Sequence, residues 1–239
     1  MQIGGLIKTS TIEYPAKISA VIFTMGCNFS CPYCHNPDLV RNLVEPLAWT
    51  EIQAFLVKRR DILDGVVISG GEPTIHLDLP KYLSEIKSLG YHIKLDTNGS
   101  NPEVIETLFS ADLIDYVALD LKTDPHSYPD YLLGAKASAK TPGQATFLPE
   151  NILRSISLLQ KRPKAAEFRT TCVSPFINSE IIVSLAKLAR GQVPWYLQGY
   201  RSTYVLNPVF MAQYPDQPSH TELLSFQKLA KAYLPCHIR

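Results

Sequence analysis

The chain has 239 residues, of which 46% are hydrophobic and 19% are charged, and its formal net charge is +1. This length can bury one sizeable hydrophobic core, so we expect a single domain over residues 1–239. The balanced charge gives no electrostatic basis for nucleic-acid binding, and no apolar run is long enough to cross a membrane. The N-terminal residues lack the apolar stretch of a secretory signal, which predicts a cytoplasmic protein with reduced cysteines.

Strand-like and helix-like patterns alternate in chain order. Short apolar runs predict six strands, at Ile18–Phe23, Gly65–Ser69, Tyr91–Asp96, Ile114–Leu121, Glu167–Val173 and Trp195–Gln198. Helical periodicity and terminal residues predict six helices, at Thr50–Leu63, Leu79–Leu89, Pro102–Ser110, Asn151–Gln160, Ser179–Arg190 and, at the C-terminus, about 221–233.

This alternation is typical of βα units that build a parallel sheet. Six units are fewer than the eight of a complete barrel. We therefore predict an α/β fold with an incomplete (β/α)6, partial TIM-like barrel, and a doubly wound sheet is the alternative.

Two long polar segments, 122–149 and 207–220, interrupt the alternation of strands and helices. Each is expected to be either a lid or partner contact, or an ordinary surface loop.

Three of the five cysteines, Cys27, Cys31 and Cys34, fall within eight residues. Three thiolates on one loop can hold three irons of a [4Fe–4S] cluster and leave the fourth iron open to an outside ligand. The last of these cysteines also belongs to a C-x-x-C-H run, the attachment signature of a c-type haem. Haem attachment of this kind follows export, which conflicts with the missing signal segment.

Structural zinc is the other alternative for this loop, and it requires a fourth protein ligand. Cys172 and Cys236 are the candidates for that ligand. Otherwise we expect Cys172 to be a small buried residue of the fifth strand. Cys236 is then expected to be a thiol without a role in the mechanism.

The predicted strand ends carry the remaining candidate residues, because chemistry in parallel α/β folds collects beyond the carboxyl ends of the strands. Residues two apart on a strand share a face, so Asp120 and Lys122 are expected to face the barrel interior together. The candidates in chain order are Gly70, Gly71 and Glu72, then Asp96 and Asn98, then Asp120 and Lys122, and finally Arg169.

Two motifs in this order resemble the signature of the radical S-adenosylmethionine (SAM) superfamily. The first is the cysteine triad within Phe23–Pro37, with the aromatic Tyr33 before its last cysteine, and the second is Ser69–Pro73, with the sequence Ser-Gly-Gly-Glu-Pro. Together with Asp96–Gly99 and Asp120–Lys122, they make the chain similar to the glycyl-radical-enzyme activases over about residues 1–205. The similarity is greatest to the activating protein of anaerobic ribonucleoside-triphosphate reductase, and it implies a radical SAM core over about residues 15–205.

The resemblance implies a [4Fe–4S] cluster on Cys27, Cys31 and Cys34, with SAM bound at its open iron. It further implies an electron from a flavodoxin- or ferredoxin-type donor, reductive cleavage of SAM, and removal of a hydrogen atom from a glycine of a partner enzyme. One alternative is a radical SAM enzyme that acts on a small molecule, similar to the 7-deazapurine synthases. The other is an iron–sulfur protein without catalytic activity.

The resemblance also implies contacts of the loop residues. The carbonyl groups of Gly70 and Gly71 would accept hydrogen bonds from the SAM ammonium, with the charge of Glu72 nearby, unless they only form a strand-end turn. Tyr33 would contact adenine, and His35 would tune the cluster by hydrogen bonding. Packing within the loop is the alternative for both side chains.

Each candidate residue at a strand end has a role in SAM binding and a structural alternative. Asp96 and Asn98 would contact the ribose or close the turn after the third strand. Asp120 and Lys122 would bind ribose hydroxyls or the SAM carboxylate, or form a structural ion pair. Arg169 would bind the SAM carboxylate or the partner backbone, or have a packing or salt-bridge role.

Overall fold

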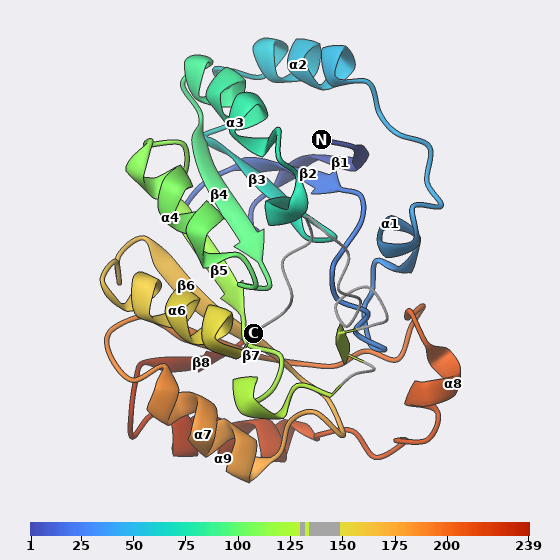
Figure 1. Cartoon of the computed structure of the whole chain (residues 1–239), viewed down its shortest axis with the longest axis vertical. Coiled ribbons are helices and arrows are strands. Elements are labelled where there is room, and N and C mark those ends of the chain that lie inside the picture. Colours follow the sequence, from blue (N-terminus) through green and yellow to red (C-terminus); the bar gives the residue numbers. More distant parts are fainter. Residues whose placement is uncertain (130–131, 134–148) are drawn as a thin grey trace. The chain divides into compact units, whose positions relative to one another are not determined.

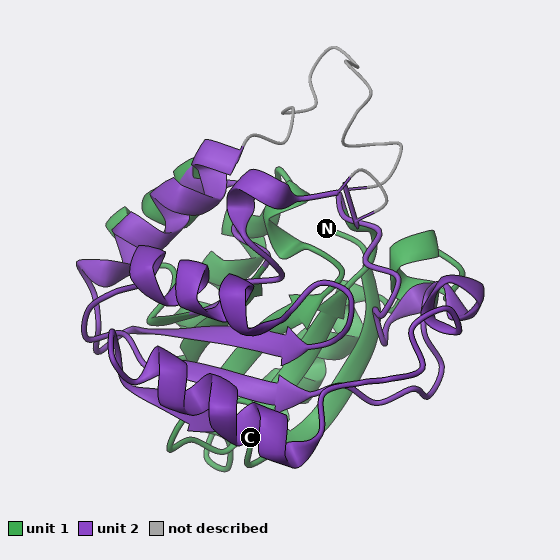
Figure 2. Ribbon diagram, turned by 90° about the horizontal axis from the view of Figure 1, so that it is seen from below, with its two compact units in different colours: residues 1–27, 38–97, 103–117 green, residues 28–37, 98–102, 118–239 purple. Residues whose placement is uncertain are grey.

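The computed structural model describes residues 1–129, 132–133 and 149–239. The chain divides into two compact units, which Figure 2 distinguishes by colour. Unit 1 consists of Met1–Cys27, Asp38–Thr97 and Glu103–Val117. Unit 2 consists of Asn28–Pro37, Asn98–Pro102 and Ala118–Arg239.

Four strands and five helical segments make up unit 1, apart from the first residues of α1 and α4. They are β1 (Ile3–Ser10), β2 (Ser19–Thr24), α1 (Pro37–Arg41), α2 (Trp49–Lys58), β3 (Gly65–Gly70), the short 3-10 helix η1 (Pro73–Ile75), α3 (Leu79–Ser88), β4 (His92–Thr97) and α4 (Pro102–Ser110) (Figure 1). The next strand, β5 (Tyr116–Asp120), begins in unit 1 and ends in unit 2.

The core of unit 1 lies around its parallel strands. β1 pairs antiparallel with β2, whereas β2 with β3 and β3 with β4 pair in parallel. The runs Ala20–Ile22 and Val66–Ile68 are at most 1% exposed, as expected for parallel strands that are covered on both faces. In α3, Leu79, Leu83 and Ile86 recur at helical spacing and are fully buried. The strands β2 and β3 and the helix α3 therefore follow from their own apolar patterns.

The described residues of unit 2 form further helices and strands. They are η2 (Pro125–Ser127), α6 (Pro149–Gln160), β6 (Ala166–Cys172), α7 (Ser179–Leu188), β7 (Trp195–Gly199), α8 (Pro208–Met211), α9 (His220–Ala230) and β8 (Cys236–Ile238). β6 pairs in parallel with β7, and β7 with β8. A capping box formed by Ser219 and Glu222 begins α9, which fixes the start of the predicted C-terminal helix.

The sheet has eight strands, which follow one another in chain order from β1 to β8. The six predicted strands are all present, with ends that differ by a few residues. A doubly wound sheet reverses its strand order at a switch point, and no reversal occurs here. The strand order therefore confirms the barrel-type α/β class and excludes the alternative.

The sequence prediction missed the first and the last strand. β1 is an edge strand with two glycines, and its second half is exposed at Lys8 and Thr9. β8 has only three residues. Neither has the continuous apolar pattern that identifies a central strand, so only their pairing with β2 and β7 defines them.

The two polar segments that interrupt the βα rhythm differ in how much of each the structure describes. Most of the segment 122–149 lies outside the described residues, so its expected role as a lid or surface loop stays a prediction. In the segment 207–220, Asn207 caps α8 through a hydrogen bond from the Phe210 amide to its side chain. No helix of the described residues combines the length and the hydropathy that a membrane crossing requires.

Candidate active site

In unit 1, the turn after β3 lies directly against the end of β2. The amide of Gly71 donates to the Thr24 carbonyl, and the amide of Glu72 donates to the Gly26 carbonyl, both at 2.9 Å. A Cβ on Gly70 would lie 2.4 Å from the Thr24 nitrogen, and one on Gly71 would lie 1.8 Å from the Gly26 oxygen. Both glycines are thus required by the close approach of the chain to itself, as the strand-end alternative predicts. Their contacts with SAM stay a prediction.

Glu72 is fully buried at this turn. Its Oε1 accepts hydrogen bonds from the Thr74 amide (3.1 Å), the Thr74 hydroxyl (2.6 Å) and the Thr97 hydroxyl (2.7 Å). The carboxylate therefore caps η1 and connects the Gly-Gly-Glu turn with the end of β4. Sequence analysis assigned no role to either threonine, although Thr97 lies inside the Asp-Thr-Asn-Gly motif.

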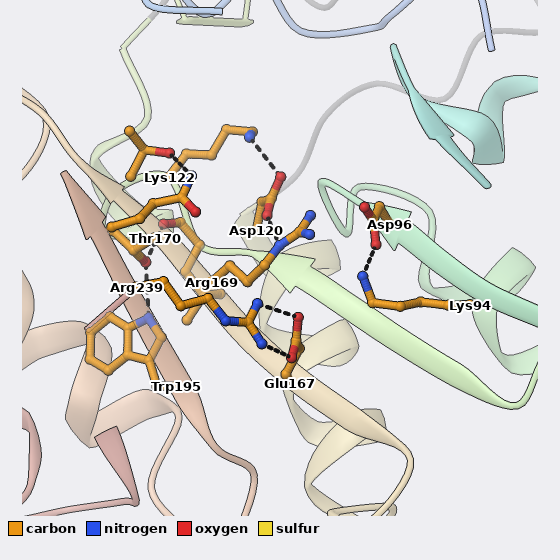
Figure 3. A network of polar contacts seen from close by, with 12 residues as sticks. Lys94, Asp96, Asp120, Lys122, Glu167, Arg169, Thr170, Trp195 and Arg239 are labelled. Atoms are coloured by element: carbon orange, nitrogen blue, oxygen red, sulfur yellow. Dashed lines mark hydrogen bonds and ion pairs between the residues drawn. The ribbon is translucent and has the colours of Figure 1, made fainter. Parts of the chain in front are cut away.

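Asp96 is also buried in unit 1, on β4, and it forms an ion pair with Lys94. Lys94 Nζ lies 2.5 Å from Asp96 Oδ1, and the two residues are 1% and 7% exposed. They are two apart on the strand, so they share a face (Figure 3). Lys94 was missed by sequence analysis, although the same spacing had singled out Asp120 and Lys122.

The cysteine loop is divided between the units, with Cys27 in unit 1 and Cys31 and Cys34 in unit 2. Cys31 is buried, and Cys27 and Cys34 are half-buried. Within unit 2 the Cys34 amide donates to the Cys31 carbonyl (3.0 Å), and the Cys34 sulfur accepts from the Asn36 amide (3.4 Å). Burial raises the pKa of the Cys31 thiol to about 12, so metal binding there must displace a proton.

The chain after β7 holds the second half of this loop in place. The Leu206 amide donates to the Cys34 carbonyl (3.0 Å), and the Asn207 amide donates to the Pro32 carbonyl (2.9 Å). His35 is exposed, and its Nδ1 lies 3.1 Å from the Thr203 carbonyl oxygen. The loop conformation therefore depends on backbone contacts with residues that are about 170 positions away in sequence.

Aromatic contacts surround the same loop. Tyr33 is 5% exposed, and its ring centroid lies 5.1 Å from that of Phe176. The His35 ring stacks on Tyr200 at a centroid distance of 5.9 Å. Both side chains thus make the packing contacts that were named as alternatives, and their roles toward adenine and the cluster stay predictions.

Asn98 closes the turn after β4 within unit 2. Its Oδ1 accepts from the Ser100 amide (3.0 Å), and its Nδ2 donates to Asn28 Oδ1 (2.9 Å). Asn28 in turn donates to the Ser100 hydroxyl (2.8 Å). This network connects the cysteine loop with the turn, and Asn28 is a further residue to which sequence analysis gave no role. Asn98 therefore closes the turn after β4, which is one of its two predicted roles, and its contact with the ribose stays a prediction.

Asp120, Lys122 and Arg169 form an ion-pair triad in unit 2. Figure 3 shows the Asp120 carboxylate between the two cations, with Arg169 Nε 2.9 Å from its Oδ1 and Lys122 Nζ 3.3 Å from its Oδ2. Burial alone would raise the pKa of the Asp120 carboxyl, but the charges of Arg169 and Lys122 lower it to about 2. The structural ion pair is therefore present, and binding of SAM by the same residues stays a prediction.

The triad predicts a pH-dependent contribution to stability. The pKa of Asp120 lies below its unfolded value of 3.8, so the stabilisation is complete above about pH 4 and is lost as the pH falls towards 2. Urea unfolding of the wild type and Asp120→Asn should differ by about 1–2 kcal/mol at pH 7, after discounting for partial exposure. The difference should shrink as the pH falls from 4 through 2, and a difference that stays constant over this range would contradict the ion-pair explanation.

The three cysteine sulfurs of the loop are ligands of the kind that bind iron–sulfur clusters. All three loop cysteines are unbridged thiols, and thiolates on one short loop suit an iron–sulfur cluster. The hydrogen bond from the Asn36 amide to the Cys34 sulfur is of the kind that supports a ligating thiolate. Among the described residues, no group of three or more His, Cys, Asp or Glu side chains is arranged to hold a metal ion.

The two cysteines outside the loop are buried in strands. Cys172 is 0% exposed at the end of β6, as predicted, and Cys236 is 1% exposed in β8. Burial raises the pKa of Cys172 to about 12 and that of Cys236 to about 11. The pKa of the loop cysteine Cys31 is raised to the same range, so these pKa values do not distinguish the strand cysteines from the loop cysteines as metal ligands, and the zinc alternative stays a prediction.

Comparison with known proteins defines the class that this fold and thiol loop represent. Residues 21–139 match the model of the radical SAM superfamily, whose members combine SAM with a [4Fe–4S] cluster. The fold agrees, since SuiB of Streptococcus suis in its SAM-bound crystal structure aligns with a TM-score of 0.58 at 17% identity. That alignment covers 92% of this chain and 49% of SuiB, so the chain spans about half of the SuiB length.

Proteins that are similar in sequence show to which group within the superfamily the chain belongs. A protein of Methanocaldococcus jannaschii that carries the name "Putative glycyl-radical enzyme activating enzyme" is 35% identical over 235 residues, which are 97% of this chain and 92% of the relative. Pyruvate formate-lyase-activating enzyme of Listeria monocytogenes is 32% identical over 124 residues, or 47% of this chain and 49% of that enzyme. The chain belongs to the radical SAM superfamily and, within it, to the glycyl-radical enzyme activating enzymes.

Proposed function

We propose that this chain reductively cleaves SAM at a [4Fe–4S] cluster held by Cys27, Cys31 and Cys34, and that it generates the glycyl radical of anaerobic ribonucleoside-triphosphate reductase. The observation that carries the proposal is the similarity, over 97% of this chain, to the Methanocaldococcus jannaschii protein named above, combined with three unbridged thiols on one short loop. We further propose a cytoplasmic location and a flavodoxin- or ferredoxin-type electron donor.

The bound cluster and SAM would supply a one-electron cleavage that releases methionine and 5′-deoxyadenosine and removes a hydrogen atom from a glycine. The chain's own residues bind and orient these groups. The Gly-Gly-Glu turn offers backbone carbonyl groups at the end of β3, and Glu72 holds that turn to β4. Arg169 and Lys122 offer two cations that can attract the SAM carboxylate, at the expense of their contacts with Asp120.

Anaerobic reconstitution tests the proposal. The protein is loaded with iron and sulfide, reduced with dithionite and incubated with SAM, and 5′-deoxyadenosine is quantified. We expect cleavage above the level of the unreduced control. The reaction is then repeated with an anaerobic ribonucleoside-triphosphate reductase, and electron paramagnetic resonance should detect a glycyl radical on that partner.

The outcomes separate the parts of the proposal. SAM cleavage without a radical on the reductase, but with a radical on a pyruvate formate-lyase, would change the partner and retain the activase. Cleavage without a radical on either protein would favour an enzyme that acts on a small molecule. Absence of both cluster and cleavage, with one zinc per chain instead, would contradict the mechanism.

A further inference from the structure

Lys94 is a buried lysine near the middle of β4, and none of the sequence motifs includes it. Its side chain is 1% exposed, and its Nζ lies 2.5 Å from Asp96 Oδ1. Burial of an ammonium group is strongly unfavourable unless a nearby charge compensates it. Each of the two charges therefore stabilises the other, and the structure places them on the same face of the strand (Figure 3).

Strand stability alone does not account for this pair. The opposite face of β4 carries Ile93 and Leu95, both fully buried, so the apolar packing of the strand is complete without Lys94. Replacement of a buried ion pair by apolar side chains is often neutral or stabilising. Two apolar side chains at positions 94 and 96 would therefore serve packing at least as well, and the charges point to binding.

The position of Asp96 indicates what is bound. It stands at the carboxyl end of a parallel strand, where ligands of α/β folds bind. The next residue, Thr97, has its side chain on the other face and donates to Glu72 at 2.7 Å. The strand end is thus anchored on both faces, by Glu72 on one and by Lys94 on the other, and an anchored carboxylate accepts hydrogen bonds from hydroxyl groups in a defined direction.

We propose that Lys94 is a positioning residue of the SAM site, which orients the Asp96 carboxylate to accept hydrogen bonds from the ribose hydroxyls of SAM. This inference rests on the proposed function, because it takes Asp96 as a residue that contacts SAM. Lys94 acts through Asp96 and makes no contact of its own with the ligand.

The dissociation constant of SAM tests this role without turnover. It is measured by calorimetry on the anaerobically reconstituted, unreduced protein. Lys94→Met is expected to raise the constant about tenfold, the effect of one lost hydrogen bond to a charged group, and Asp96→Asn at least as much. Lys94→Arg keeps the charge and should recover part of the affinity. In turnover, Lys94→Met should raise the KM for SAM and leave kcat within about twofold.

A double-mutant cycle isolates the coupling. If Lys94 acts through Asp96, the Lys94→Met change has no further effect on SAM affinity in the Asp96→Asn background. The double variant also removes both buried charges of the pair, which favours its folding. Lys94→Gln, which retains an N–H donor, takes the place of Lys94→Met if that variant does not fold, with a smaller loss of affinity expected.

Arg239→Met is the matched control. Arg239 pairs with the fully buried Glu167 through two contacts of 3.1 and 2.9 Å, and it lies outside the proposed SAM-contact residues. The Arg239 side chain is 37% exposed, so Arg239→Met removes a partly exposed cation from a buried carboxylate. It should lower the melting temperature, as Lys94→Met does, and leave the dissociation constant of SAM unchanged.

Three results overturn the inference in distinguishable ways. If Asp96→Asn weakens SAM binding and Lys94→Met does not, Lys94 is not a positioning residue and the proposed function remains. If Lys94→Met weakens binding equally in both backgrounds, Lys94 acts independently of Asp96. If the reconstituted wild type binds no SAM, the proposed function fails and the inference fails with it.

Discussion

Replacing Gly71 with alanine is expected to destabilise the protein by about 3 kcal/mol. The new methyl group would lie 1.8 Å from the Gly26 carbonyl oxygen, which is a backbone atom and cannot move away as a flexible side chain would. The turn after β3 would have to shift and break the hydrogen bonds to Thr24 and Gly26 that hold it against β2. Urea unfolding of the metal-free protein measures the loss.

Gly5→Ala is the matched control in the same unit. Its methyl group would meet the Phe23 side chain at 3.5 Å, which is ordinary van der Waals contact, and β1 gains from the lower entropy of alanine. We expect a change within about 0.5 kcal/mol. If Gly71→Ala were as stable as Gly5→Ala, the close approach of the two strand ends would be absent in solution.

Loss of any one loop cysteine is expected to abolish SAM cleavage. Cys27→Ala, Cys31→Ala and Cys34→Ala each remove one of the three thiolates that would hold the proposed cluster, and no other thiol lies on the loop. Iron and acid-labile sulfide per chain, measured after anaerobic reconstitution, should fall with the cleavage rate to the background of the protein-free control.

Cys172→Ala and Cys236→Ala are the corresponding controls. Both thiols are buried in strands of unit 2, so these variants should lose some stability through packing and keep their iron, sulfide and cleavage activity. Loss of bound metal in either control, with metal retained in Cys31→Ala, would contradict the triad and favour a zinc site that uses strand cysteines.

Much of the fold could be predicted from local patterns. The six βα units were predictable because each strand and helix carries its own apolar period, as Leu79, Leu83 and Ile86 do in α3. The thiol loop and the Gly-Gly-Glu turn were predictable because both are contiguous motifs. β1 and β8 were not, because an edge strand with glycines and a strand of three residues become recognisable only through the partner strand.

In the candidate site, too, some contacts could be predicted from the sequence and others could not. Sequence spacing placed Asp120 and Lys122 on one face, but Arg169, the closer partner of Asp120, comes from a strand 49 positions later. Lys94 was overlooked because a lysine inside a strand is ordinarily exposed, and only the tertiary structure shows that its side chain is buried against Asp96.

The sequence by itself determined the class of chemistry and the βα rhythm, because both depend on residues that are neighbours in the chain or repeat with a short period. The tertiary structure alone decided which charges are paired, why Gly70 and Gly71 must lack a side chain, and which backbone groups support the cysteine loop. Those properties depend on contacts between distant segments, such as that of Leu206 with Cys34, and no local pattern records them.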